Sequence, residues 1–161
     1  MKTIMSCLAL VALAVFTSAA FAQDQAPAQE PAPAQQVAPA QEPTLTSVEA
    51  KFDTTTDHKK QDTKLDVYLK NHDGQEVAKS EGNEGLWDKH STHTVTLQIE
   101  GNPTKAEVAH GSVSLTFHPP GGDTWKFNYK FTLKFSDGSS ITKEVFGGVL
   151  TQYNTARTDP L

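Results

Sequence analysis

The most regular hydrophobic pattern in the chain lies between Thr124 and Phe135. Apolar residues, most of them aromatic, occupy every second position there, and lysine, asparagine and threonine fill the positions between them. Because successive side chains of a β-strand point to opposite faces, this period of two predicts a long strand with one aromatic and one cationic, polar face. We expect the aromatic face in a core and the polar face in water, as in an antiparallel sheet.

Shorter alternating segments surround this strand. They are centred on residues 48–52, 65–69, 95–99, 113–117 and 141–146, with a short return strand at 75–80. Gly147–Gly148 is expected to break or bulge the last of them, and 101–111 to be a connector with one helical turn. Seven or eight short strands without long helical periods predict an all-β fold, an antiparallel two-sheet β-sandwich whose second sheet covers the aromatic face.

The first 43 residues differ in composition from the rest. Residues 1–22 carry Lys2, an apolar run from Ile4 to Phe16 and the small-residue sequence Ala20–Ala22, which is typical of a signal peptide. We therefore expect an exported protein, periplasmic or extracellular. Residues 23–43, rich in proline, alanine and glutamine, predict a disordered linker that acts as a spacer rather than as a docking motif.

The remaining sequence predicts one domain. We expect the β-sandwich over residues 44–152 and a polar tail over 153–161, and no later segment approaches the roughly 20 apolar residues of a transmembrane helix. The only cysteine, Cys7, lies in the predicted signal peptide, so disulfides, zinc–thiolate sites and cysteine nucleophiles are excluded from the mature chain.

The charge balance limits the partners. Residues 1–22 hold one lysine and no acid, so 13 basic and 19 acidic residues remain after them, a net charge of −6 with histidine neutral. An acidic excess argues against a nucleic acid partner and gives no help in approaching an anionic membrane.

Several short motifs resemble those of PLAT/LH2 domains. They are Thr56–Asp57, a basic loop, Asp62–Leu69, Leu115–His118, Trp125, Tyr129 and Phe146, in the order of that family and spread over roughly residues 46–150. The segment His118–Phe131 departs from the family by being longer and more aromatic. The resemblance implies an eight-stranded β-sandwich that binds lipid surfaces, proteins or, in some members, calcium through its end loops.

Four aspartates cluster around the first predicted loop. Asp53, Asp57, Asp62 and Asp66 offer carboxylate oxygens of the kind that calcium takes six to eight at a time, so they form a candidate calcium site. The alternative is that they are solvated turn residues and bind no metal. The spacing matches no EF-hand, lysines share the loop, and aspartate is common in solvated turns.

Trp87 and a lysine stripe are the candidate ligand-binding residues. Trp87 lies in the glycine-containing loop 81–90, where it either enters a membrane interface, stacks on a sugar ring, or plugs one end of the sandwich. Lys126, Lys130 and Lys134 share the outer face of the long strand, where they either meet an acidic partner or polysaccharide or form a solvated face. The six histidines are scattered, which favours surface positions over a metal site.

Sequence motifs of common enzymes are absent, among them G-x-S-x-G, H-E-x-x-H and phosphate-binding loops. We therefore predict a non-enzymatic binding or accessory module of PLAT-like type, which contacts a lipid surface or a protein partner through its end loops, with calcium as a candidate cofactor. The alternatives are a carbohydrate-binding module that uses Trp87 and the lysine stripe, and a hydrolase with convergent acids.

Overall fold

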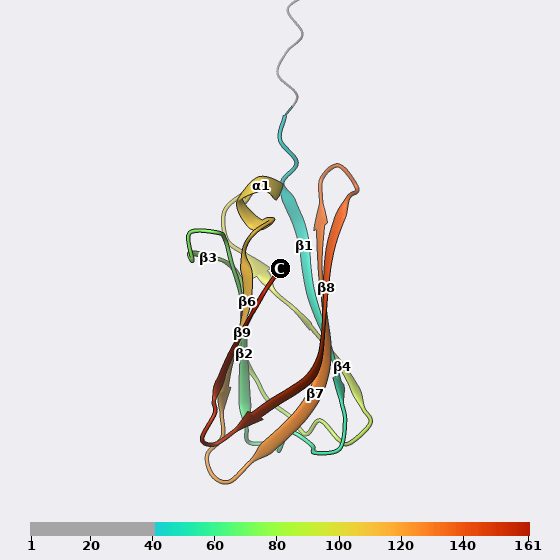
Figure 1. The fold of residues 1–161 in the computed structure, drawn as a ribbon, viewed down its shortest axis with the longest axis vertical. Coiled ribbons are helices and arrows are strands. Elements are labelled where there is room, and N and C mark those ends of the chain that lie inside the picture. The colour runs from blue at the N-terminus through green and yellow to red at the C-terminus, as the bar shows by residue number, and fades with distance from the viewer. Residues whose placement is uncertain (1–40) are drawn as a thin grey trace, which may run out of the picture. The chain divides into compact units, whose positions relative to one another are not determined.

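Residues 41–161, described here from a computed structural model, form two antiparallel β-sheets packed against each other (Figure 1). The predicted all-β sandwich is thereby confirmed. The predicted signal peptide and the linker up to residue 40 lie outside the described residues. No helix within residues 41–161 is long and apolar enough to cross a membrane.

The sheets contain four and five strands. The four-stranded sheet has the order β4 (Thr92–Thr96), β1 (Leu45–Thr54), β7 (Thr124–Phe135) and β8 (Ser140–Thr151). The five-stranded sheet has the order β5 (Gln98–Ile99), β3 (Glu76–Asn83), β2 (Lys64–Lys70), β6 (Ser112–His118) and β9 (Ala156–Pro160).

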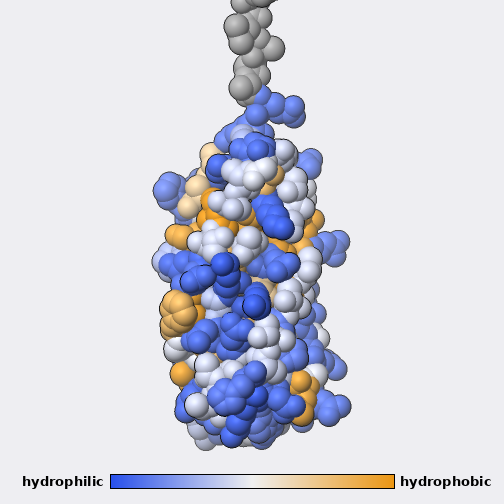
Figure 2. All heavy atoms as spheres, turned by 90° about the vertical axis from the view of Figure 1, so that its right-hand side faces the viewer, coloured by the Kyte–Doolittle hydropathy of each residue, from blue (hydrophilic) through white to orange (hydrophobic). Residues whose placement is uncertain are grey.

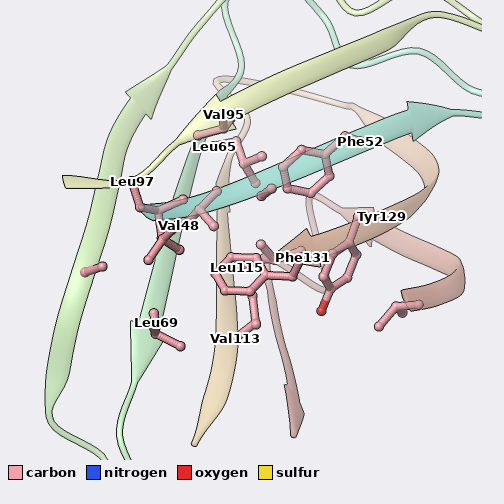
Figure 3. Packing of buried hydrophobic residues seen from close by; sticks show 14 of the residues in the cluster. Val48, Phe52, Leu65, Leu69, Val95, Leu97, Val113, Leu115, Tyr129 and Phe131 are labelled. Atoms are coloured by element: carbon pink, nitrogen blue, oxygen red, sulfur yellow. The ribbon is translucent and has the colours of Figure 1, made fainter. Parts of the chain in front are cut away.

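The aromatic face of β7 lies in the core, as its period of two predicts. All six of its apolar side chains are buried, and they alternate with half-buried or exposed polar ones. Side chains of the two sheets meet in Figure 3: Phe52, Tyr129 and Phe131 from one, and Leu65, Val113 and Leu115 from the other. Each buried large side chain contributes roughly 1.5–3 kcal/mol before the cost in conformational entropy.

The structure has nine strands among the described residues, because one predicted strand divides and one was not predicted. The predicted strand at 95–99 divides at Leu97, whose N–H donates to the carbonyl of Val48. Before Leu97 the chain pairs with β1 as β4, and after it the chain pairs with β3 as β5. A strand that passes from one sheet to the other closes the corner of a sandwich.

The predicted polar tail at 153–161 is wrong, because residues 156–160 form β9 and pair with β6. Its inward-facing residues are Arg157 and Asp159, which bond to each other at 2.6 and 2.8 Å. The strand therefore lacks the alternation of apolar residues by which strands are recognised. Leu161 continues the contact by donating its N–H to the carbonyl of Gly111.

The predicted bulge and helical turn are both present. Helix α1 (Lys105–Val108) is a single turn that begins at a Thr104 capping box. In β8 the pairing with β7 shifts between Phe127 and Tyr129, and Gly147 adopts a φ of +67° at the bulge. A bulge and the inward-facing Lys143 are features that keep an edge strand such as β8 from pairing with other chains.

Candidate functional site

Four loops gather at one end of the sandwich, the lower end in Figure 1. They connect β1 to β2, β3 to β4, β6 to β7 and β8 to β9. Residues 41–44 lead into β1 at the opposite end (Figure 1). These four loops, which we call the loop end, therefore lie away from the point where the described chain begins.

Backbone hydrogen bonds fix the loops of this end to one another. Lys59 and Trp87 exchange two N–H···O bonds of 3.0 and 3.1 Å, which join the β1–β2 and β3–β4 loops. Gln152 N–H donates to the carbonyl of Asp123 at 3.2 Å and joins the β8–β9 and β6–β7 loops. Because the connections are main-chain bonds between neighbouring loops, the loop end is a preformed surface.

A fully buried lysine stabilises this arrangement from inside. The Lys59 ammonium donates to the carbonyls of Thr63 and Gly85 at 2.5 and 2.9 Å, and it lies 5.0 Å from the ring centroid of Trp87. Burial lowers the pKa of Lys59 to about 8, although nearby carboxylates, Asp123 foremost, partly oppose the shift. Lys59 thus connects two loops as a cation held by carbonyl dipoles.

Trp87 is a core residue, so its prediction as an exposed ligand-binding residue is wrong. Its side chain is only 5% exposed and packs against Phe52 and Trp125, with ring centroids 5.5 and 5.2 Å away. His93 stacks on it at 4.7 Å, nearly parallel. The alternative reading of Trp87 as a plug of one end of the sandwich is confirmed.

The loop end encloses an open pocket of about 340 Å³. It is lined by Asp57, His58, Lys60, Lys89, Gly122, Asp123, Thr124, Thr151, Gln152 and Tyr153. We call it the loop-end pocket. Asp123 is buried and anchors it, since one carboxylate oxygen accepts bonds from Thr63 Oγ1 at 2.7 Å and from the Lys60 N–H at 3.1 Å.

An exposed tyrosine stands beside this pocket. Tyr153, in the β8–β9 turn, is 91% exposed, and the Thr151 hydroxyl accepts the N–H groups of Tyr153 and Asn154 at 3.1 and 3.0 Å. The turn is therefore ordered while the ring is left to solvent. Tyr153 was not among the predicted site residues, because it lies in the predicted tail; the available signal was an aromatic residue in an otherwise polar segment.

The four aspartates do not form one site, so the predicted calcium site is wrong. Asp53 accepts a bond from Thr92 Oγ1 on the outer face of the four-stranded sheet, whereas Asp66 bonds to His118 on the outer face of the other sheet. Asp57 pairs with Lys126, and Asp62 is exposed in a turn. Within residues 41–161, no three histidine, aspartate or glutamate side chains are grouped to hold a metal ion.

The lysine stripe lies on the outer face of β7, and two of its members are in ion pairs. Lys126 Nζ lies 2.8 Å from Asp57, whose pKa this contact lowers, and Lys130 Nζ lies 3.2 Å from Glu144. Lys134 is exposed near the other end of the strand. The three lysines therefore share a face, and that face is less cationic than the sequence indicates.

Comparisons with known proteins add no assignment. No protein-family model matches the chain, and no curated protein matches it at a significant level. The resemblance to PLAT/LH2 domains stays a prediction that rests on its short motifs.

Proposed function

We propose that this protein is an exported, non-enzymatic glycan-binding module and that the loop-end pocket is its binding site. The observation that carries the proposal is the exposed Tyr153 ring beside an open pocket that contains hydrogen-bond donors and acceptors. Tyr153, and not the buried Trp87, is the aromatic residue that stacks on the sugar in this proposal.

The chemistry of the pocket lining supports a polyhydroxylated ligand. Each sugar hydroxyl both donates and accepts, so it needs partners of both kinds. Asp57 and Asp123 supply acceptors, Lys60 and Lys89 supply donors, and the Gln152 amide supplies both. Charges of both signs give the pocket no strong preference for an ionic ligand. An aromatic ring next to such groups is suited to the apolar face of a sugar ring.

A lipid surface fits the loop end less well. With Trp87 in the core, the large hydrophobic side chains exposed at the described loop end are Leu86 and Tyr153. Interfacial binding strength scales with buried apolar area, and two side chains supply little of it. The net charge of −6 after residue 22 also gives no help in approaching an anionic membrane.

Affinity electrophoresis tests the proposal. The purified protein is run through gels that contain xylan, mannan, β-glucan or chitosan, and it is sedimented in parallel with insoluble peptidoglycan. We expect retardation or co-sedimentation with at least one of these polymers, which Tyr153→Ala abolishes. Leu86→Ala is the matched control, since it removes an exposed side chain at the same end that does not line the pocket.

Two results would overturn the proposal. One is the absence of binding to every polymer, with flotation on phosphatidylserine vesicles as a positive result for the lipid reading. The other is polymer binding that Tyr153→Ala and Leu86→Ala leave equally unchanged, because the site would then lie elsewhere.

A further inference from the structure

A second pocket lies on the outer face of the four-stranded sheet. It measures about 130 Å³, and its lining includes Asp53, Asn128, Lys130, Glu144 and Phe146. Phe146 is 74% exposed, although it sits within β8 rather than in a loop. Figure 2, seen from the side of this sheet, shows a mainly hydrophilic surface with separate hydrophobic spots. An isolated exposed ring beside polar groups repeats the composition of the loop-end pocket.

The bulge in β8 determines which side chains reach this face. Phe127 pairs with Gly148 and Tyr129 with Val145, so Phe146 and Gly147 together lie opposite Asn128. The Gly147 N–H donates to Asn128 Oδ1 at 2.8 Å and holds the bulge in place. Without the extra residue, Val149 would point inward and Leu150 outward; with it, Val149 joins Phe146 on the outer face.

The two pockets are joined along β7 and β8. Lys126 lies two residues from Asn128 on the same face and pairs with Val149 across the strands. Its Nζ lies 2.8 Å from Asp57, which lines the loop-end pocket. The five residue steps of strand from Phe146 to Thr151 span on the order of 15 Å, so one sugar ring cannot occupy both pockets.

We propose that the ligand is an extended chain of neutral sugars, which runs from the loop-end pocket over Lys126 and Val149 to Phe146. This inference rests on the proposed function and specifies its ligand class. Lys126 is paired with Asp57, and Lys130 with Glu144. The second pocket is also lined by Lys51 and Asp53, whose charges are opposite, so the path offers hydrogen bonds without a net field that favours an ionic polymer. The lysine stripe thereby becomes part of the path instead of an acid-binding patch.

Calorimetry with a size series tests this path. The probes are mono- to hexasaccharides of a neutral polymer that retards the protein. We expect affinity to rise with chain length, and Phe146→Ala to weaken the hexasaccharide about tenfold while leaving the disaccharide unchanged. Thr142→Ala is the matched control, because it shortens another exposed side chain on the outer face of β8 away from the loop end. Phe146 is solvent-exposed, so its replacement does not threaten the core.

Amide chemical shifts give a second measurement on the unmodified protein. The hexasaccharide is expected to shift the Gly147 and Gly148 amides, and the disaccharide to shift only residues of the loop end. If Phe146→Ala binds long chains like the wild type, or if these glycine amides do not respond, the extended path is wrong and the proposed function survives. If no oligosaccharide binds at all, the extended path and the proposed glycan-binding function are both wrong.

Discussion

The phenolic oxygen of Tyr129, on the central strand β7, donates a 2.8 Å hydrogen bond to Asp159 on the edge strand β9 of the other sheet. Asp159 also binds the Arg157 guanidinium through both carboxylate oxygens. Burial opposes the ionised form of Asp159, but the bonds from Arg157 and Tyr129 outweigh it and hold the pKa of the carboxyl below its ordinary value. Tyr129 thereby connects the two sheets through a charged group.

Tyr129→Phe is expected to lower the free energy of unfolding by about 1.5 kcal/mol, since it removes one hydrogen bond to a half-buried charge and keeps the ring. Urea denaturation measures the change. Tyr68→Phe is the control, because the Tyr68 hydroxyl bonds to Glu81 in an exposed setting and its loss should cost at most about 0.5 kcal/mol. If both replacements lower the free energy of unfolding equally, the hydrogen bond between Tyr129 and Asp159 stabilises the fold no more than an exposed one does.

The sandwich could be predicted from the sequence because its core strands bury one face and expose the other. The alternation of apolar and polar residues from Trp125 to Phe135 follows from that geometry. Strand β9 could not be predicted, because Arg157 and Asp159 satisfy each other's charge on the inner face and so take positions that apolar residues normally fill. Its strand character depends on pairing with β6, which is distant in sequence.

The candidate site was harder to predict for a related reason. Loop residues carry no periodic pattern, so the sequence does not show which loop side chains turn inward. Trp87 turns inward because Phe52, Trp125 and the caged Lys59 surround it, and Tyr153 stays outside because its turn is short and bonded to Thr151. The distribution of aspartates between two opposite faces likewise depends on strand register.

Replacement of Gly148 by alanine should be costly. A Cβ at this position would lie 2.7 Å from Cε2 of the Phe127 ring, which is fully buried and has no space to move into. We expect a loss of about 1–3 kcal/mol in the free energy of unfolding, as for other overpacked cores. Gly121→Ala is the control, with open space around its Cβ and a change of less than about 0.5 kcal/mol expected. Thermal or urea unfolding of both variants decides the point, and a neutral Gly148→Ala would contradict the tight contact.

Trp87→Ala should destabilise the fold instead of abolishing a surface contact. Removal of a large buried aromatic side chain typically costs about 3–5 kcal/mol. The exposed Tyr153→Ala should change stability by less than about 0.5 kcal/mol and serves as the matched replacement at the same end. Chemical denaturation followed by circular dichroism distinguishes the two. A Trp87→Ala variant as stable as the wild type would mean that the ring lies in solvent.

Lys59 makes stability depend on pH in the alkaline range. Its pKa is about 8 in the folded protein and near 10.4 in an unfolded chain, so between these values the unfolded state binds more protons. Stability therefore rises with pH in this window, because the cost of burying the ammonium disappears as the folded lysine loses its proton.

From pH 7.5 to 9.5, this relation predicts a gain on the order of 2 kcal/mol in the free energy of unfolding. Urea titrations at a series of pH values measure the gain. Lys59→Met should flatten the profile in this range, because it removes the group whose burial lowers its pKa to about 8. Lys64→Met, which removes an exposed lysine paired with Glu84, should keep the full slope. A flat wild-type profile between these pH values would mean that Lys59 is solvated, and a falling profile would mean that its carbonyl and carboxylate partners outweigh the cost of burying the ammonium; either result contradicts the lowered pKa.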